Sequence, residues 1–130
     1  MKRTIALLLL LLLAATPALA KHKHREAWYQ AQWCEKHGGQ TEYILPDKTR
    51  VDCLTRTHAW EFDFARGTKP YEAVGQALHY GRMTGKRPGI VLIIERGSDH
   101  LKVYPIQAII RYYDLPIDLE TIVNSGAPTK

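Results

Sequence analysis

The chain has 130 residues, a formal net charge of +5 and two cysteines. This length corresponds to one domain with a modest hydrophobic core, and a charge of this size does not by itself indicate nucleic-acid binding. The spacing of Cys34 and Cys53 excludes a zinc site built on paired cysteines.

The N-terminus has the pattern of a cleavable signal peptide. Lys2 and Arg3 precede an unbroken apolar run, Ile5–Ala15, and Ala18-Leu19-Ala20 matches a cleavage site. The run of eleven residues is too short for a transmembrane helix, which needs about 20 apolar residues, although an uncleaved anchor is the alternative. We therefore predict that residues 1–20 are removed and that the protein is exported, periplasmic or secreted, with no stable membrane anchor. Without Lys2 and Arg3, 16 basic residues face 13 acidic ones, a charge of +3.

The first half of the mature chain predicts a helix followed by three short strands. The basic segment Lys21–Arg25 is predicted to be a solvated, frayed terminus, and the alternative is that it holds a metal or an anion. A helix is predicted over Arg25–His37, where two glycines end it. Turn sequences then separate strands over Thr41–Leu45, Thr49–Leu54 and Ala59–Ala65. The third strand alternates an apolar face with an acidic one: Trp60, Phe62 and Phe64 against Glu61 and Asp63.

The second half predicts a helix, a buried strand and another helix. The helix spans Pro70–Thr84, and the continuous apolar run Gly89–Glu95 is typical of a central strand buried on both faces. The intervening helix is long enough for a parallel connection. A last helix over Leu101–Tyr113 contains Pro105, which is acceptable if the helix begins at or just before it.

These elements predict one α/β domain over residues 21–123, with a disordered tail over 124–130. Its sheet is a three-strand antiparallel meander plus a parallel buried strand, flanked by helices.

The two cysteines are the only pair available for a disulfide. In an oxidising compartment Cys34 and Cys53 either form a bridge or remain free thiols that pack as small hydrophobic residues. Cys53 alternates with Asp52 along its strand and therefore points away from it. A bridge would attach the first helix to the sheet on the side opposite to Asp52.

Two carboxylates on neighbouring strands are candidates for metal binding. If the second and third strands pair through their short turn, Asp52 lies on the same face as Glu61. Mg²⁺ is typically held by one or two carboxylates together with water and substrate phosphate, and it can activate a water for hydrolysis. The alternative is an ordinary solvated polar face of an antiparallel sheet.

The order of elements, Asp52, Glu61 and the sequence Gln76-Ala-Leu-His-Tyr80 together resemble the PD-(D/E)xK nuclease superfamily, in its RecB-like branch with a Q-x-x-x-Y motif. Small bacterial proteins grouped near that superfamily are also similar, and the resemblance covers about residues 25–115. It implies a restriction-endonuclease-like αβββαβ core that binds Mg²⁺ or Mn²⁺ through Asp52 and Glu61. Gln76 and Tyr80 would orient the metal-bound water or DNA.

The resemblance also implies an extra carboxylate, from Glu26 or Glu35. His79 either contacts phosphate or is a surface residue.

The chain departs from the family pattern at one position. A lysine is expected two residues after Glu61, and Asp63 stands there. Asp63 is then a third metal ligand or the mark of a site that does not cut. Lys69 is the candidate to replace the lysine, because the planar, permanently charged guanidinium of Arg66 is a poorer substitute.

Three functions follow. The first is an exported, metal-dependent nuclease that hydrolyses phosphodiester bonds of DNA or RNA, with Asp52, Glu61, Asp63, Lys69, Gln76 and Tyr80 at its site. The second is a catalytically inactive module with the same fold. It would bind nucleic acid or a protein partner through a basic surface formed by Lys48, Arg50, Arg56, Arg66, Lys86 and Arg87. The third is an exported structural protein without a site.

Overall fold

The structure is a computed structural model that describes residues 22–67 and 69–124. The predicted signal peptide, and the predicted tail apart from Asn124, lie outside the described residues. The elements are α1 (Glu26–Lys36), β1 (Gln40–Ile44), β2 (Arg50–Leu54), β3 (His58–Phe64), α2 (Glu72–Thr84), β4 (Arg87–Ile94), the 3₁₀ turn η1 (Gly97–Asp99), α3 (His100–Tyr112) and β5 (Asp118–Val123).

The strands form one mixed sheet in the order β1-β2-β3-β4-β5. β1, β2 and β3 are antiparallel neighbours, whereas β3, β4 and β5 run parallel. The predicted meander and parallel buried strand are confirmed. The fifth strand was not predicted, because its sequence Asp-Leu-Glu-Thr-Ile-Val breaks the alternation of polar and apolar residues that indicates a half-buried strand.

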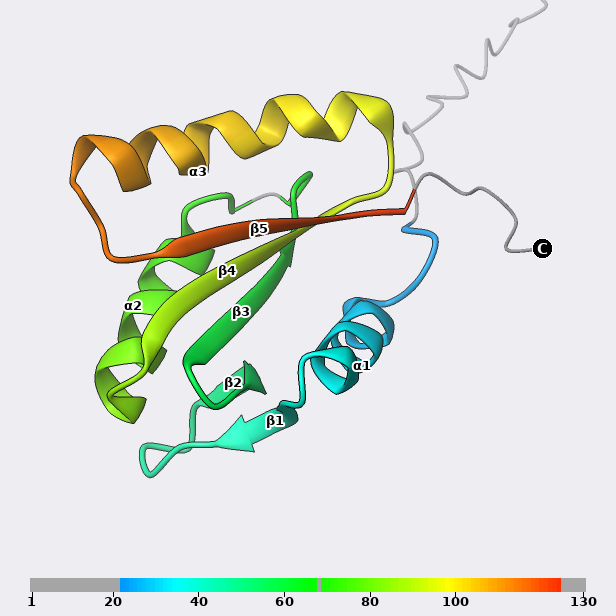
Figure 1. The fold of residues 1–130 in the computed structure, drawn as a ribbon. Helices are drawn as coiled ribbons and strands as arrows, with labels where there is room; N and C mark the ends of the chain where they lie inside the picture. The colour runs from blue at the N-terminus through cyan, green and yellow to red at the C-terminus, as the bar shows by residue number, and fades with distance from the viewer. Residues whose placement is uncertain (1–21, 68, 125–130) are drawn as a thin grey trace, which may run out of the picture.

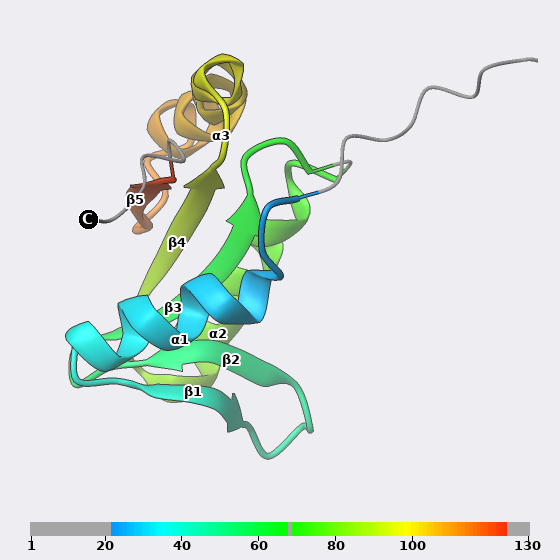
Figure 2. The ribbon, with the colours of Figure 1, turned by 90° about the vertical axis from the view of Figure 1, so that its right-hand side faces the viewer.

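Helices cover both faces of the sheet (Figure 1). On one face, Ile90, Leu92 and Ile94 of β4 pack in a core cluster with residues of α2 and α3. On the other face, Val91 and Ile93 of β4 pack with α1. The view in Figure 2 places α1 on the opposite side of the sheet from α2. β4 is therefore the central strand buried on both faces that its continuous apolar sequence predicts.

The last helix begins earlier than Pro105 suggests. α3 starts at His100, five residues before this proline. Proline lacks the N–H group that would donate to the carbonyl of Leu101, and Leu101 is 77% exposed, so water can satisfy that carbonyl. No helix in the described part of the chain is long and apolar enough to cross a membrane.

The two cysteines form the disulfide, with an S–S distance of 2.01 Å and Cα atoms 5.7 Å apart. The bond joins α1 to β2, on the side that the alternation of Cys53 and Asp52 predicts. Gly39 lies so close to the bridge that a Cβ atom there would be 2.5 Å from Cys53 Sγ. This position therefore accepts only glycine. A structural disulfide is compatible with an extracellular location.

Replacing both cysteines by alanine is expected to lower the free energy of unfolding by about 3 kcal/mol, because the bridge closes a loop between residues 19 positions apart. Thermal unfolding of the double variant, and of the wild type with and without reductant, measures the effect. A melting temperature unchanged by reduction would contradict the prediction.

Candidate active site at the fork between strands 2 and 3

β2 and β3 separate from each other after two residue pairs. Their register contains only Cys53 with Trp60 and Leu54 with Ala59. At the next position Asp52 Oδ2 accepts a hydrogen bond of 2.7 Å from the backbone N–H group of Phe62. A side-chain carboxylate thus takes the place of a backbone carbonyl. We call this divergence, with Asp52 on one strand and Glu61 on the other, the fork.

Glu61 is the most unusual side chain at the fork. It is only 6% exposed, yet its Oε2 atom has no hydrogen-bond partner among the described residues. Its carboxyl group lies near that of Asp52, and burial, followed by the charge of Asp52, raises its pKa. A buried polar oxygen without a partner destabilises the fold, which is typical of functional rather than structural positions.

A cavity of about 370 Å³ lies over these two carboxylates. We call it the carboxylate cavity, and its lining residues are Glu26, Lys48, Thr49, Arg50, Asp52, Glu61, Gln76 and Tyr80. Asp52 and Glu61 lie on the same side, as predicted. Of the two acidic candidates on α1, Glu26 lines the cavity, whereas Glu35 is exposed and does not. Side chains from helices on both faces of the sheet therefore meet at the fork.

α2 contributes the two residues of the Q-x-x-x-Y sequence. Gln76 and Tyr80 are four positions apart, so they lie on one face of the helix, and both line the carboxylate cavity. Burial and the negative charges of Glu61 and Asp52 raise the pKa of Tyr80. The Tyr80 hydroxyl therefore remains protonated and can donate a hydrogen bond into the cavity.

The other two predicted site residues, Asp63 and Lys69, do not line the carboxylate cavity. A Cβ atom placed on Gly67 would be 3.2 Å from Asp63 Oδ1, so the Asp63 carboxylate points toward the loop that follows β3. Lys69 is exposed and its Nζ atom lies 3.4 Å from Glu72 Oε2.

Within residues 22–67 and 69–124, no group of three or more histidine, cysteine or acidic side chains is arranged to hold a metal ion. This applies to Asp52 and Glu61 taken with Asp63 and equally to the two taken with Glu26. Asp63 is still near enough for its charge to raise the pKa of Glu61 and of Glu26.

The acidic side chains at the fork have raised pKa values. Burial, followed by the charge of Asp52, raises the pKa of Glu61 to about 10. Burial and the charges of Asp52 and Asp63 raise the pKa of Glu26 to about 7. The pKa of Asp52 is also raised, because burial outweighs the hydrogen bond from Phe62. Without a cation, Glu61 therefore carries a proton at neutral pH, and a bound cation would favour its ionised form.

A second buried carboxylate, Glu95, binds the N-terminal segment. It is 3% exposed and lies within 2.7 to 2.9 Å of the Tyr29 hydroxyl, the Lys23 backbone N–H group and His22 Nδ1. Burial alone would raise the pKa of Glu95, but these hydrogen bonds hold it below its usual value. The prediction of a frayed terminus is wrong for His22 and Lys23, because the buried carboxylate requires partners. The position of Glu95 directly after an apolar strand was the feature of the sequence that could have indicated a buried carboxylate in need of partners.

The sequence also placed Asn124 in the disordered tail. Its backbone N–H group instead donates to Ile94 at 2.8 Å, and its side chain donates to the Tyr29 hydroxyl at 3.0 Å. The tail prediction is therefore wrong for this residue.

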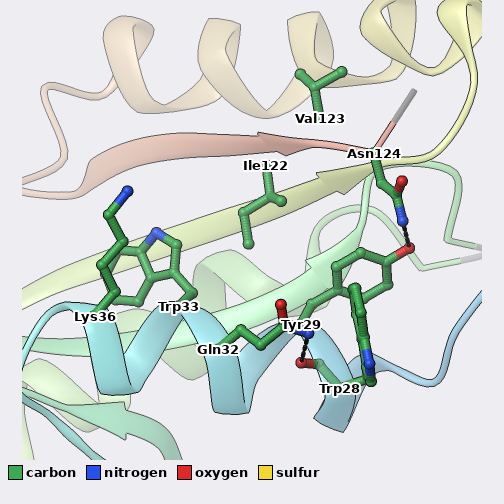
Figure 3. A pocket seen from close by; sticks show the side chains of 8 residues that line it. All are labelled: Trp28, Tyr29, Gln32, Trp33, Lys36, Ile122, Val123 and Asn124. Atoms are coloured by element: carbon green, nitrogen blue, oxygen red, sulfur yellow. Dashed lines mark hydrogen bonds between the residues drawn. The ribbon is translucent and has the colours of Figure 1, made fainter. Parts of the chain in front are cut away.

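A groove of about 280 Å³ between α1 and β5 is lined mostly by apolar groups (Figure 3). Trp33 and Lys36 of α1 border it on one side, and Ile122 of β5 on the other. None of the described residues that line this groove carries a carboxylate, and the Tyr29 hydroxyl is already bonded to Asn124 and Glu95. The chemistry of a hydrolytic site is therefore concentrated at the carboxylate cavity.

Comparisons of the chain with protein-family models, with curated proteins and with solved structures found no match. The functional argument therefore depends on the fork and its cavity.

Replacing Glu61 by glutamine is expected to stabilise the protein increasingly as the pH rises. In the wild type the unfolded chain releases this proton near pH 4.5, while the folded chain keeps it up to about pH 10. Folding thus becomes less favourable between these values, by on the order of 1 kcal/mol per pH unit, and glutamine removes that dependence.

Urea unfolding at pH 5, 6.5 and 8 in the absence of divalent ions measures the difference, with Glu35→Gln on the exposed side of α1 as a control. A difference between Glu61→Gln and wild type that is the same at all three pH values would contradict the raised pKa.

Proposed function

We propose that this protein is an exported, divalent-metal-dependent nuclease with a restriction-endonuclease-like core, which hydrolyses phosphodiester bonds of DNA or RNA. The observation that carries the proposal is Glu61, a buried carboxylate with an unpartnered oxygen beside Asp52 in an open cavity. A structural role does not require a buried carboxylate with an unpartnered oxygen to lie beside a second acidic group. The order of elements from α1 to β4 supports the same core.

The donor set at the fork is suited to Mg²⁺ or Mn²⁺. Mg²⁺ prefers oxygen ligands and is commonly held by one or two carboxylates, with water and substrate phosphate completing its coordination. Asp52 and Glu61 would hold the ion, and Glu26 offers a further carboxylate in the same cavity. A cation would provide a partner for the Glu61 Oε2 atom and would lower the raised pKa values of the carboxyl groups. Such an ion supplies charge stabilisation at the scissile phosphate and a more acidic water.

The residues around the carboxylates have separate tasks in this proposal. Tyr80 and Gln76, which share one face of α2, orient a water or phosphate oxygen at the α2 side of the cavity. Arg50 brings positive charge to the same cavity, and its Nη1 atom is held 2.7 Å from Glu42 Oε2. The disulfide is consistent with action outside the cytoplasm, on foreign or extracellular nucleic acid.

The alternative is a catalytically inactive module that uses the same surface for binding. Asp63 stands where the family pattern has a lysine, and Lys69 is paired with Glu72 instead of replacing it. Neither position therefore brings a cation to the carboxylate cavity, which favours the inactive module. The two functions differ in whether binding is followed by cleavage.

The nuclease reading predicts cleavage of plasmid DNA or single-stranded RNA by the disulfide-bonded protein in Mg²⁺ or Mn²⁺, and none in EDTA. Asp52→Asn and Glu61→Gln are expected to lower the rate by about 100-fold or more, since even the partners of metal ligands contribute 10- to 100-fold. Glu26→Gln should also slow cleavage, whereas its matched control Glu35→Gln should not. Gel electrophoresis of the products over time gives the rates.

Cleavage that Asp52→Asn and Glu61→Gln leave unchanged would show that the activity comes from another site or a contaminant. Binding of nucleic acid without cleavage under all metal conditions would select the inactive module.

A further inference from the structure

The turn between β1 and β2 brings a lysine to the carboxylate cavity. Lys48 lines the cavity, and its backbone φ of +70° lies in the left-handed region that residues other than glycine rarely adopt. Its ammonium group has no hydrogen bond or ion pair within the described ranges. The turn thus holds an uncommitted cation beside Asp52 and Glu61, in a backbone conformation that requires support from its surroundings.

That support comes from Asp47, the preceding residue. Asp47 Oδ1 accepts hydrogen bonds from the Thr49 backbone N–H group at 3.0 Å and from the Thr49 hydroxyl at 2.6 Å. Asp47 Oδ2 lies 2.7 Å from His79 Nε2. His79 belongs to α2, the helix that also carries Gln76 and Tyr80. We call the Asp47–His79 contact the latch, because it ties the turn to the helix across the cavity.

Other basic side chains, of β2 and of the loop after β3, are already engaged. Arg50 is paired with Glu42, Lys69 with Glu72, and Arg66 lies 3.7 Å from Glu95. The cavity therefore combines an acidic floor, formed by the buried Glu61 and the half-buried Asp52 and Glu26, with a cationic rim on which Lys48 is uncommitted. A ligand that binds to both parts would place an anionic group against Lys48 at the rim. It would contact the carboxylates through a cation bound between them. A phosphodiester has this chemistry.

We propose that Lys48 forms a phosphate subsite at the rim of the carboxylate cavity, where its ammonium group contacts a phosphate of the bound nucleic acid, and that the latch positions it. This inference rests on the proposed function. An ammonium group on a flexible side chain provides a compact point charge for a single phosphate oxygen. His79 acts through the turn and is a positioning residue.

Binding is tested with a fluorescein-labelled single-stranded DNA 20-mer and a matching duplex, in Ca²⁺, by fluorescence anisotropy at several salt concentrations. Lys48→Ala is expected to weaken binding by about 10-fold and to reduce the slope of log affinity against log salt by about one, because one phosphate contact is lost. Lys48→Arg should keep most of the affinity. Lys69→Ala, the matched control, should bind like the wild type.

The latch is tested by a double-mutant cycle. His79→Ala should weaken binding less than Lys48→Ala does, and should have no further effect once Lys48 is alanine. Additive effects of the two substitutions would overturn the positioning role of His79. Circular dichroism of each variant confirms that the fold is retained.

The outcomes separate this proposal from the nuclease function. If Lys48→Ala leaves affinity and salt slope unchanged while the wild type cleaves, the subsite is wrong and the nuclease stands. If Lys48→Ala weakens binding but no protein cleaves, the subsite stands and the nuclease is wrong. Absence of oligonucleotide binding by the wild type overturns both.

Discussion

The geometry of the candidate site depends on one hydrogen bond, from the Phe62 backbone to the Asp52 carboxylate. In a fully paired β2–β3 ladder the backbone carbonyl of β2 would take that donor, and Asp52 would project from one face. Because the side chain takes it instead, the sheet opens at this point. Glu26 from one face and Gln76 from the other can then line the same cavity as Glu61.

This arrangement costs stability, and the surrounding structure offsets the cost. Placing Asp52 and Glu61 together in a buried position raises the pKa of both carboxyl groups. The neighbouring residue Cys53 is anchored to α1 by the disulfide, and β4 is buried on both faces beside β3. A fold stabilised in these ways can tolerate an unfavourable group where function requires it.

Much of this structure could be predicted from residue patterns. The predicted helices and strands that precede β5 agree with the structure to within two residues at most ends, the disulfide forms, and Asp52 and Glu61 share a cavity. β5 escaped prediction because its alternation is broken.

The sequence placed Lys48 on a basic binding surface but not in the carboxylate cavity, because its place there depends on a left-handed turn and on a long-range contact to α2. Asp63 and Lys69 do not line the cavity, since periodicity gives the face of a strand and not the course of the loop that follows it.

The fork has a practical consequence for spectroscopy. The Phe62 amide proton is hydrogen-bonded to a titratable carboxylate instead of a strand carbonyl. Its chemical shift in a nuclear magnetic resonance spectrum therefore depends directly on what Asp52 binds. A single backbone signal in an isotope-labelled sample therefore reports whether a proton, a cation or a ligand occupies the site. It does so without a substrate, and it would give the affinity of this position for each ion separately from any turnover.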